Sequence, residues 1–201
     1  LEDSQFRQAI QTRTPEWTAV WDRPNPRYAD GPRDIWYVHR ASLPSMEGWS
    51  IVWVWSTILT LRQHAGRVRN LAAAEEQLQQ LRQRLASAKT RLRGAAEIDM
   101  RVKLILDKYH VARYLEVRRV VREEHAFKQS HRGRPGPDTA YRKITKRRFD
   151  VQWSTDEDAI AYDRKSDGMY PLMTNDRQLS AAQVLEAHKG QPMIEKRFEQ
   201  I

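Results

Sequence analysis

The stretch from Gly48 to Ser56 constrains the fold more than any other part of the sequence. In an extended chain the side chains alternate between two faces, and here both faces are apolar. One face would carry Trp49, Ile51, Trp53 and Trp55, and the other Val52 and Val54. Because such a strand needs cover on both sides, the sequence predicts a strand inside a covered sheet. We interpret the early tryptophans as core packing, with a base-stacking platform as the alternative.

Four further segments have the composition of strands: 35–39, 114–121, 148–154 and 169–174. Residues 1–34 contain four prolines, so turns and short extended pieces are expected there. Asp156, Glu157 and Asp158 could be taken for a metal cluster. Negative charge at the positive end of a helix dipole explains them without a metal, and a helix is expected to begin there.

A heptad pattern marks the middle of the chain. Its apolar positions are Leu71, Leu78, Leu85 and Leu92, interleaved with Ala74, Leu81, Ala88 and Ala95. The pattern predicts one long helix from about 57 to 94 that packs in coiled-coil fashion, followed by an antiparallel helix over 96–109. This helical hairpin is basic. Its outer face is either solvated or an arm that touches DNA or another subunit.

Composition narrows the classes of function. The net charge of +9 and a pI near 10.0 favour an anionic partner such as nucleic acid. The absence of cysteine excludes disulfides, thiolate metal sites and a cysteine nucleophile, and is consistent with a cytoplasmic protein. No apolar run approaches the roughly 20 residues of a membrane span. The first residue is Leu, which suggests a fragment of a longer protein.

Much of the positive charge falls in residues 128–148, with eight Lys or Arg and one Asp. Within this segment residues 131–137 contain two glycines and two prolines, so regular structure is not expected. We predict a basic loop that follows DNA phosphates through Lys128, Arg132, Arg134, Arg147 and Arg148. An AT-hook that enters the minor groove through Arg-Gly-Arg-Pro is one alternative. A merely solvated loop is the other.

The last 22 residues are expected to form two helical pieces, 180–189 and 192–201, with a bend between them. Ser180 and Gln183 have the spacing of a capping box, whereas Pro192 interrupts a helix and suits the start of a new one. In the second piece Ile194 and Phe198 would share a buried face. Glu195 lies beside that face.

This C-terminal stretch resembles the last catalytic helix of DDE transposases of bacterial insertion sequences. The relevant branch of that family carries Tyr, two residues, Arg, three residues, Glu, six residues and Lys. Glu195 takes the Glu position, while His188 and Gln191 stand where the family has Tyr and Arg. The Lys would fall just after Ile201. Residues 167–175, Asp-Gly-Met-Tyr-Pro-Leu-Met-Thr-Asn, and the Arg-Gly-Arg-Pro-Gly-Pro loop are also similar to that branch.

The resemblance implies an α/β chain with a partial ribonuclease-H-like fold, a mixed sheet with flanking helices that carries a long basic helical hairpin. Residues 1–56 would be the strand-rich part of the core, 57–110 the helical insertion and 111–201 the remainder of the core. Asp167 would be a turn residue.

The chemistry implied is metal-dependent cleavage and joining of DNA strands during transposition. Two Mg²⁺ or Mn²⁺ ions would be held by two aspartates and Glu195, which is thus both a metal ligand and a catalytic residue. His188 and Gln191 would contact DNA. Both aspartates are expected upstream of this chain, so the isolated fragment should be inactive. The expected partners are double-stranded DNA at insertion-sequence ends and, in the full-length protein, a second copy.

Two other functions are compatible with the residues. The chain could be a non-catalytic, basic DNA-binding module, an interpretation that rests on the charge and on residues 128–148. It could also be a structural protein that assembles through the heptads of residues 71–95.

Overall fold

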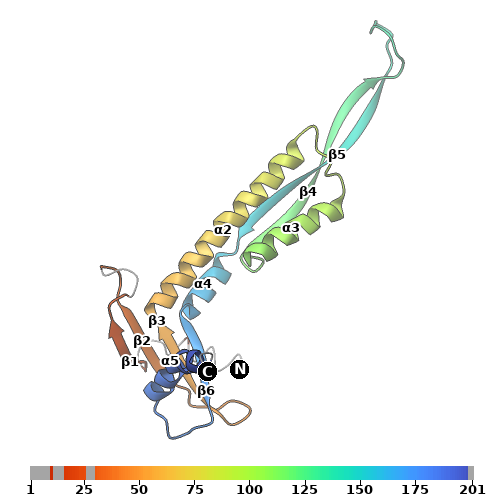
Figure 1. The fold of residues 1–201 in the computed structure, drawn as a ribbon. Helices are drawn as coiled ribbons and strands as arrows, with labels where there is room; N and C mark the ends of the chain where they lie inside the picture. Colours follow the sequence, from red (N-terminus) through yellow and green to blue (C-terminus); the bar gives the residue numbers. More distant parts are fainter. Residues whose placement is uncertain (1–9, 11–15, 26–29, 199–201) are drawn as a thin grey trace. The chain divides into compact units, whose positions relative to one another are not determined.

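Two antiparallel sheets and four helices make up the part of the chain that the structure describes (Figure 1). The structure is a computed structural model that describes residues 10, 16–25 and 30–198; for residues 191–198 it describes the backbone alone. The chain divides into two units, residues 1–66 with 161–201, and residues 67–160. The expectation of a fold with both helices and strands is confirmed. The mixed sheet that was expected is not found among the described strands, which all pair antiparallel. No described helix is both long and apolar enough to span a membrane.

The first unit is built on a four-stranded sheet. Its strands are β1 (Thr18–Arg23), β2 (Asp34–Arg40), β3 (Ser50–Ser56) and β6 (Met169–Thr174), in the order β1-β2-β3-β6. All neighbours pair antiparallel, with Trp53 of β3 opposite both His39 and Pro171. These positions match the strands expected at 35–39, 49–56 and 169–174.

Strand β3 is covered on both faces, as its composition predicts. Val52 and Val54 pack in a cluster with Val184 and Leu185 of helix α5 (Ala181–Phe198). The tryptophan face packs in a second cluster, in which Trp53 is 1% exposed. The core interpretation of this aromatic segment is therefore confirmed for Trp53. The sheet holds α5 on one face through apolar side chains.

Gly168 fixes the entry into β6. Its φ is +80°, and a Cβ there would lie 2.1 Å from Thr60 Oγ1 and 2.5 Å from the Ser56 carbonyl oxygen. Its amide donates to Gln63 Oε1 at 2.6 Å, and its carbonyl accepts from the Ser56 amide at 3.0 Å. Only glycine allows this approach to the first turn of helix α2 (Thr57–Ala86).

Helix α5 is continuous, so the prediction of two pieces with a bend at residues 190–192 was wrong. The capping box is present: Gln183 donates its amide to Ser180 Oγ at 3.2 Å, and Gln183 Oε1 accepts from the Ser180 amide at 2.8 Å. Pro192 removes one amide donor from the helix. The helix nevertheless continues past Pro192 to Phe198.

The second unit packs α2 and α3 (Ala95–Tyr109) against a long hairpin of β4 (Leu115–Gln129) and β5 (Tyr141–Thr155). Helix α4 (Glu157–Ser166) follows β5. The heptad residues of α2 supply much of the core, together with side chains from α3 and the hairpin: Ala74, Leu78, Leu81, Leu85, Ile98, Leu115 and Val151. The heptad stripe thus packs inside this unit.

Helix α2 ends at Ala86, and the prediction that it continues to residue 94 was wrong. Ser87 Oγ accepts the Lys89 amide at 3.4 Å, and Thr90 Oγ1 accepts the Leu92 amide at 3.3 Å. Such local bonds compete with the backbone bonds of a helix. Leu92 still enters the core, from the connection rather than from a helix.

The β4–β5 hairpin is longer than predicted. Both strands have 15 residues, and their register runs unbroken from Leu115 opposite Thr155 to Gln129 opposite Tyr141. Only the segments that pack against the helices were expected as strands, because only those show a sustained strand-like pattern of apolar residues. The remainder projects past α2 and α3 as a two-stranded ribbon (Figure 1).

Candidate nucleic-acid interface

The charges of the β4–β5 hairpin are sorted along its length. Near the helices Asp150 accepts from Arg122 at 2.6 Å and from Arg82 at 3.2 Å. One step outward, Arg148 pairs with Glu124 at 2.9 Å, and Arg147 with Glu123 at 3.7 Å. In this part of the hairpin, positive charge is largely compensated.

Beyond these pairs the hairpin is strongly basic. We call residues 125–146 the distal ribbon. It contains one acid, Asp138, and six exposed basic residues that form no ion pair within the described part of the chain: Lys128, Arg132, Arg134, Arg142, Lys143 and Lys146. The net charge of the distal ribbon is therefore +5.

The tip of the distal ribbon is closed by hydrogen bonds. The Ser130 amide donates to the Ala140 carbonyl at 2.8 Å, and the Gly136 amide to Thr139 Oγ1 at 2.7 Å. Gln129 Nε2 donates to the Gly133 carbonyl at 3.2 Å. These bonds present the Arg132 and Arg134 backbone on an ordered turn.

The structure divides the five DNA contacts predicted in this region into two groups. Lys128, Arg132 and Arg134 lie in the distal ribbon, whereas Arg147 and Arg148 are paired with glutamates. The irregular segment 131–137 is confirmed, but Lys128 and residues 141–148 are in strands, so the expected loop is shorter. Arg142, Lys143 and Lys146 were not singled out. These three residues belong to the same run of positive charge, but no strand was predicted over this part of the run.

A basic two-stranded ribbon has the dimensions and charge of a nucleic-acid-binding element. The DNA major groove admits a two-stranded β-ribbon, and exposed Lys and Arg bind phosphates with release of counterions. Phe127 and Tyr141 are 69% and 53% exposed beside these cations. Aromatic side chains next to cations add a surface on which bases or sugars can pack.

The second group of predicted site residues lies on α5. The His188 ring is 6.1 Å from the Tyr170 ring, measured between centroids. Both residues line a cavity of about 350 Å³ together with Asp34, Trp36 and Lys189. Gln191 and Glu195 are on the same helix, but their side chains lie outside the described residues. The proximity of Glu195 to β6 stays a prediction.

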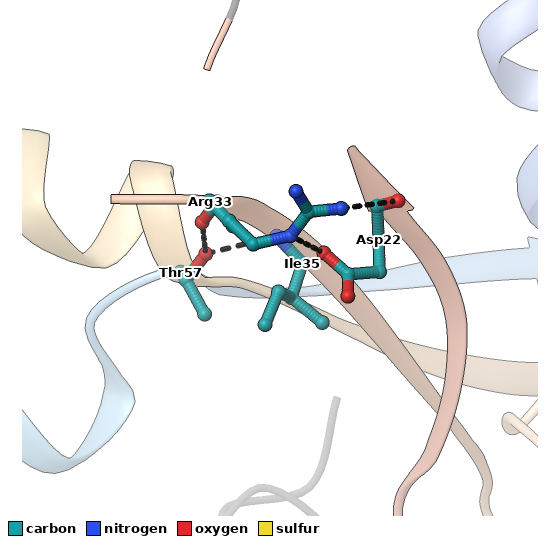
Figure 2. A network of polar contacts seen from close by, with 4 residues as sticks. All are labelled: Asp22, Arg33, Ile35 and Thr57. Carbon is teal, nitrogen blue, oxygen red and sulfur yellow. Dashed lines mark hydrogen bonds and ion pairs between the residues drawn. The ribbon is translucent and has the colours of Figure 1, made fainter. Parts of the chain in front are cut away.

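The chain on both sides of Asp34 is pinned by polar contacts, shown in Figure 2. Arg33 donates from Nε to Asp22 Oδ1 at 2.5 Å, and Thr57 Oγ1 donates to the Arg33 carbonyl at 2.8 Å. The Ile35 amide donates to Thr57 Oγ1 at 3.0 Å. This network ties the start of β2 to the end of β1, through Asp22, and to the first residue of α2. It holds Asp34 at the cavity.

Burial shapes the electrostatics of this cavity. The Lys189 ammonium lies 3.9 Å from the centre of the Trp36 ring. Burial lowers the pKa of Lys189, although Asp34 acts in the opposite direction. Burial also raises the pKa of Tyr170 to about 12, and the Tyr170 hydroxyl has no hydrogen-bond partner among the described residues. These contacts account for the packing of His188 but leave its contact with DNA a prediction.

The described residues alone do not make a metal site. Among them no group of three or more His, Cys, Asp or Glu side chains could hold a metal ion. Asp156 Oδ1 accepts the Ala159 amide at 2.9 Å, which confirms its role at the start of α4. The role of Glu195 as a ligand of Mg²⁺ or Mn²⁺ stays a prediction, because its side chain lies outside the described residues.

Comparison with protein-family models, curated proteins and solved structures gave no match for this chain. The resemblance to DDE transposases therefore rests on the residues that carry it, and the family stays a prediction. The charge sorting of the hairpin is independent of that resemblance.

Proposed function

We propose that this chain binds double-stranded DNA through the distal ribbon, as part of a DDE-type transposase. The observation that carries DNA binding is the sorting of charge along the hairpin. Five cations lie beyond the last acid–base pair, and a sixth, Lys146, lies opposite its Glu124. One acid, Asp138, accompanies them, and the cations are exposed. Packing stabilises an exposed cationic surface of this kind very little. An anionic partner would stabilise it more, because it would neutralise the repulsion between the cations.

The contacts proposed are to phosphates rather than to base edges. Lys and Arg that neutralise phosphates give affinity with little dependence on sequence, and log affinity falls with log salt by about 0.9 per phosphate contacted. Four of the cations test the ribbon directly: Arg132, Arg134, Arg142 and Lys143.

The catalytic part of the proposal rests on the resemblance. Glu195 would contribute one carboxylate to a Mg²⁺ or Mn²⁺ site on a ribonuclease-H-like core, with both aspartates supplied from outside this chain. The structure contributes one supporting fact, that the helix carrying Glu195 packs on a sheet through Val184 and Leu185. In the full-length protein we expect a homodimer, again from the resemblance.

DNA binding is tested with a labelled 20-base-pair duplex, followed by fluorescence anisotropy at several salt concentrations. The variant replaces Arg132, Arg134, Arg142 and Lys143 by Gln. We expect at least a tenfold loss of affinity and a salt slope smaller by roughly 3 to 4, because about 0.9 is lost per phosphate contact. The control replaces Lys103, Arg118, Lys108 and Lys165, which lie outside the ribbon. Equal affinities for both variants would refute a ribbon-specific interface.

A non-catalytic DNA-binding module is the second candidate function, because the charge sorting of the hairpin supports DNA binding without any catalytic residue. The two candidates differ in what happens when the two aspartates that the resemblance implies are supplied. A transposase would cleave insertion-sequence ends with Mg²⁺, and Glu195→Gln would abolish cleavage while duplex binding persists. Binding without any Glu195-dependent cleavage would identify the module.

A further inference from the structure

A second basic feature of residues 67–160 is a cavity of about 350 Å³ between β5 and the connection 87–94. Its apolar lining includes Leu85, Leu92 and Phe149. Its polar lining includes four cations from two segments that are distant in sequence: Arg93, Lys146, Arg147 and Arg148. Among the described residues, no acidic one lines this cavity.

The four cations differ in how firmly they are held. Arg148 is fixed, because it donates from Nε to Glu124 at 2.9 Å and from Nη1 to the Ser87 carbonyl at 3.2 Å. The Arg147 side chain is 76% exposed, and its Nε lies 3.7 Å from Glu123 Oε1, which is long for an ion pair. Its pairing with Glu123 is therefore weak. Arg93 and Lys146 form no ion pair with any described residue. At least two cations of the cavity thus have no ion-pair partner in the described part of the chain, although Lys146 lies opposite Glu124 in the hairpin.

We propose that this cavity binds one phosphodiester of the DNA backbone, with the attached sugar against its apolar side. Arg93 and Lys146 would contact the phosphate oxygens, since exposed ammonium and guanidinium groups are the usual partners of phosphate. Leu92, 8% exposed, and Phe149 would pack against the sugar. The proposal rests on the proposed DNA binding and extends it to a defined pocket.

Two observations favour a nucleic-acid phosphate over a small free anion. Lys146 is the last cation of the distal ribbon, so the cavity continues the basic surface of β5. The connection 87–94 adds Lys89 and Arg91 and contains no acid. An anion that extends along this line would meet cations on both sides of the cavity, whereas a free phosphate would fill only part of it.

The chain offers a direct probe, because one of its four phenylalanines lines the cavity and another lies on the distal ribbon. The protein is labelled with 4-fluorophenylalanine, and the ¹⁹F resonances of Phe127 and Phe149 are assigned with Phe127→Leu and Phe149→Leu. A 20-base-pair duplex is then added. We expect both resonances to shift. In the Arg93→Gln, Lys146→Gln variant the Phe149 shift should be lost and the Phe127 shift retained, with affinity reduced three- to tenfold.

Each outcome separates the pocket from the ribbon. If Phe127 shifts and Phe149 does not, the pocket proposal fails and DNA binding by the ribbon stands. If only Phe149 shifts, the pocket is supported and the ribbon is not the interface. If neither shifts, both proposals fail.

A second titration identifies the group that is recognised. Deoxycytidine monophosphate should shift Phe149 at millimolar concentration, whereas deoxycytidine should not. Equal shifts with both compounds would overturn recognition of the phosphate. Unchanged thermal unfolding of the double variant, and full binding by Lys103→Gln, Arg118→Gln, complete the control for folding and for bulk charge.

Discussion

The two sheets of this protein are both antiparallel, yet they are held in different ways. In the four-stranded sheet, residues 51–54 of β3 are at most 1% exposed, and apolar clusters cover both faces. In the two-stranded sheet, residues 122–128 of β4 are all exposed. The first sheet is fixed by burial, whereas the outer half of the second is held by its own ladder and by cross-strand ion pairs.

This difference separates stability from binding. A two-stranded hairpin alone is marginally stable in water, so a ribbon that extends past its core adds little to folding. What it adds is an exposed row of cations. Substitutions in the covered sheet should therefore change the free energy of unfolding, and substitutions in the distal ribbon should change binding.

The largest effect on stability is expected from Gly168→Ala. The added Cβ would meet the Ser56 carbonyl and Thr60 at 2.1 to 2.5 Å, and the positive φ disfavours any L side chain. We expect a loss of about 4 kcal/mol, at the upper end for single substitutions. Urea unfolding followed by tryptophan fluorescence reports this unit, since six of the seven tryptophans precede residue 56.

The matched control is Gly136→Ala in the tip loop, where no atom of another described residue, apart from its chain neighbours, lies within 4 Å of an added Cβ. It should change the free energy of unfolding by less than about 0.5 kcal/mol. A loss below about 1 kcal/mol in Gly168→Ala would show that β6 can shift away from α2.

A smaller loss is expected from Leu78→Ala in the other unit. Leu78 is fully buried among α2, α3 and the hairpin, and emptying such a site costs about 3 kcal/mol. Exchange of the β4 and β5 amides, measured by mass spectrometry, should accelerate near Leu115 and Val151. Leu104→Ala, at a position 59% exposed, should leave exchange unchanged. Protection retained in Leu78→Ala would mean that the hairpin does not depend on this core.

Burial also explains how much of the fold could be predicted. The strand at 49–56 and its neighbours were predicted because their apolar residues alternate or cover both faces. The outer hairpin was missed because charged residues do not show strand periodicity in hydrophobicity, and its pairing depends on a partner strand. The end of α2 was missed because the heptad pattern persists to Leu92, while Ser87 and Thr90 redirect the backbone.

The candidate interface was predictable in part for the same reason. A charge run locates positive residues but does not reveal which of them have partners. Arg147 and Arg148 looked equivalent to Arg132 and Arg134 until the structure placed Glu123 opposite Arg147 and paired Glu124 with Arg148. Arg93 could not be associated with Lys146 from sequence, since 52 residues separate them and only the fold brings them to one cavity.

Tyr170→Phe should change the free energy of unfolding modestly, and it should stabilise the protein rather than destabilise it. The Tyr170 hydroxyl is buried without a described partner, so its removal should leave the protein as stable or more stable by about 1 kcal/mol. The pKa of Tyr170 is raised to about 12, above the value of about 10 for an exposed tyrosine. The unfolded chain therefore loses its proton first as pH rises.

It follows that the free energy of unfolding should fall between about pH 10 and 12, and that Tyr170→Phe should reduce this fall. Urea unfolding at pH 9, 10 and 11 measures both effects, with Tyr162→Phe as the control because Tyr162 is exposed. An identical pH dependence in both variants would show that the Tyr170 hydroxyl is solvated.

The smallest change in stability, with a gain in binding, is expected from Glu123→Gln, Glu124→Gln. Exposed ion pairs contribute about 0 to 1 kcal/mol each, so the hairpin should remain folded. Arg147 and Arg148 would lose their acidic partners. The substitutions would also remove two carboxylates that repel the phosphates of bound DNA. We expect severalfold tighter binding, and a salt slope steeper by up to about 0.9 for each arginine that reaches a phosphate.

The control is Glu97→Gln, Glu116→Gln, which removes the same charge from pairs with Arg101 and Arg118. If both variants tighten binding equally, the gain comes from net charge alone. A gain confined to positions 123 and 124 would extend the interface from the distal ribbon to the cavity beside Arg93. Glu123 and Glu124, rather than the geometry of the strands, would then determine which arginines of the hairpin are available to DNA.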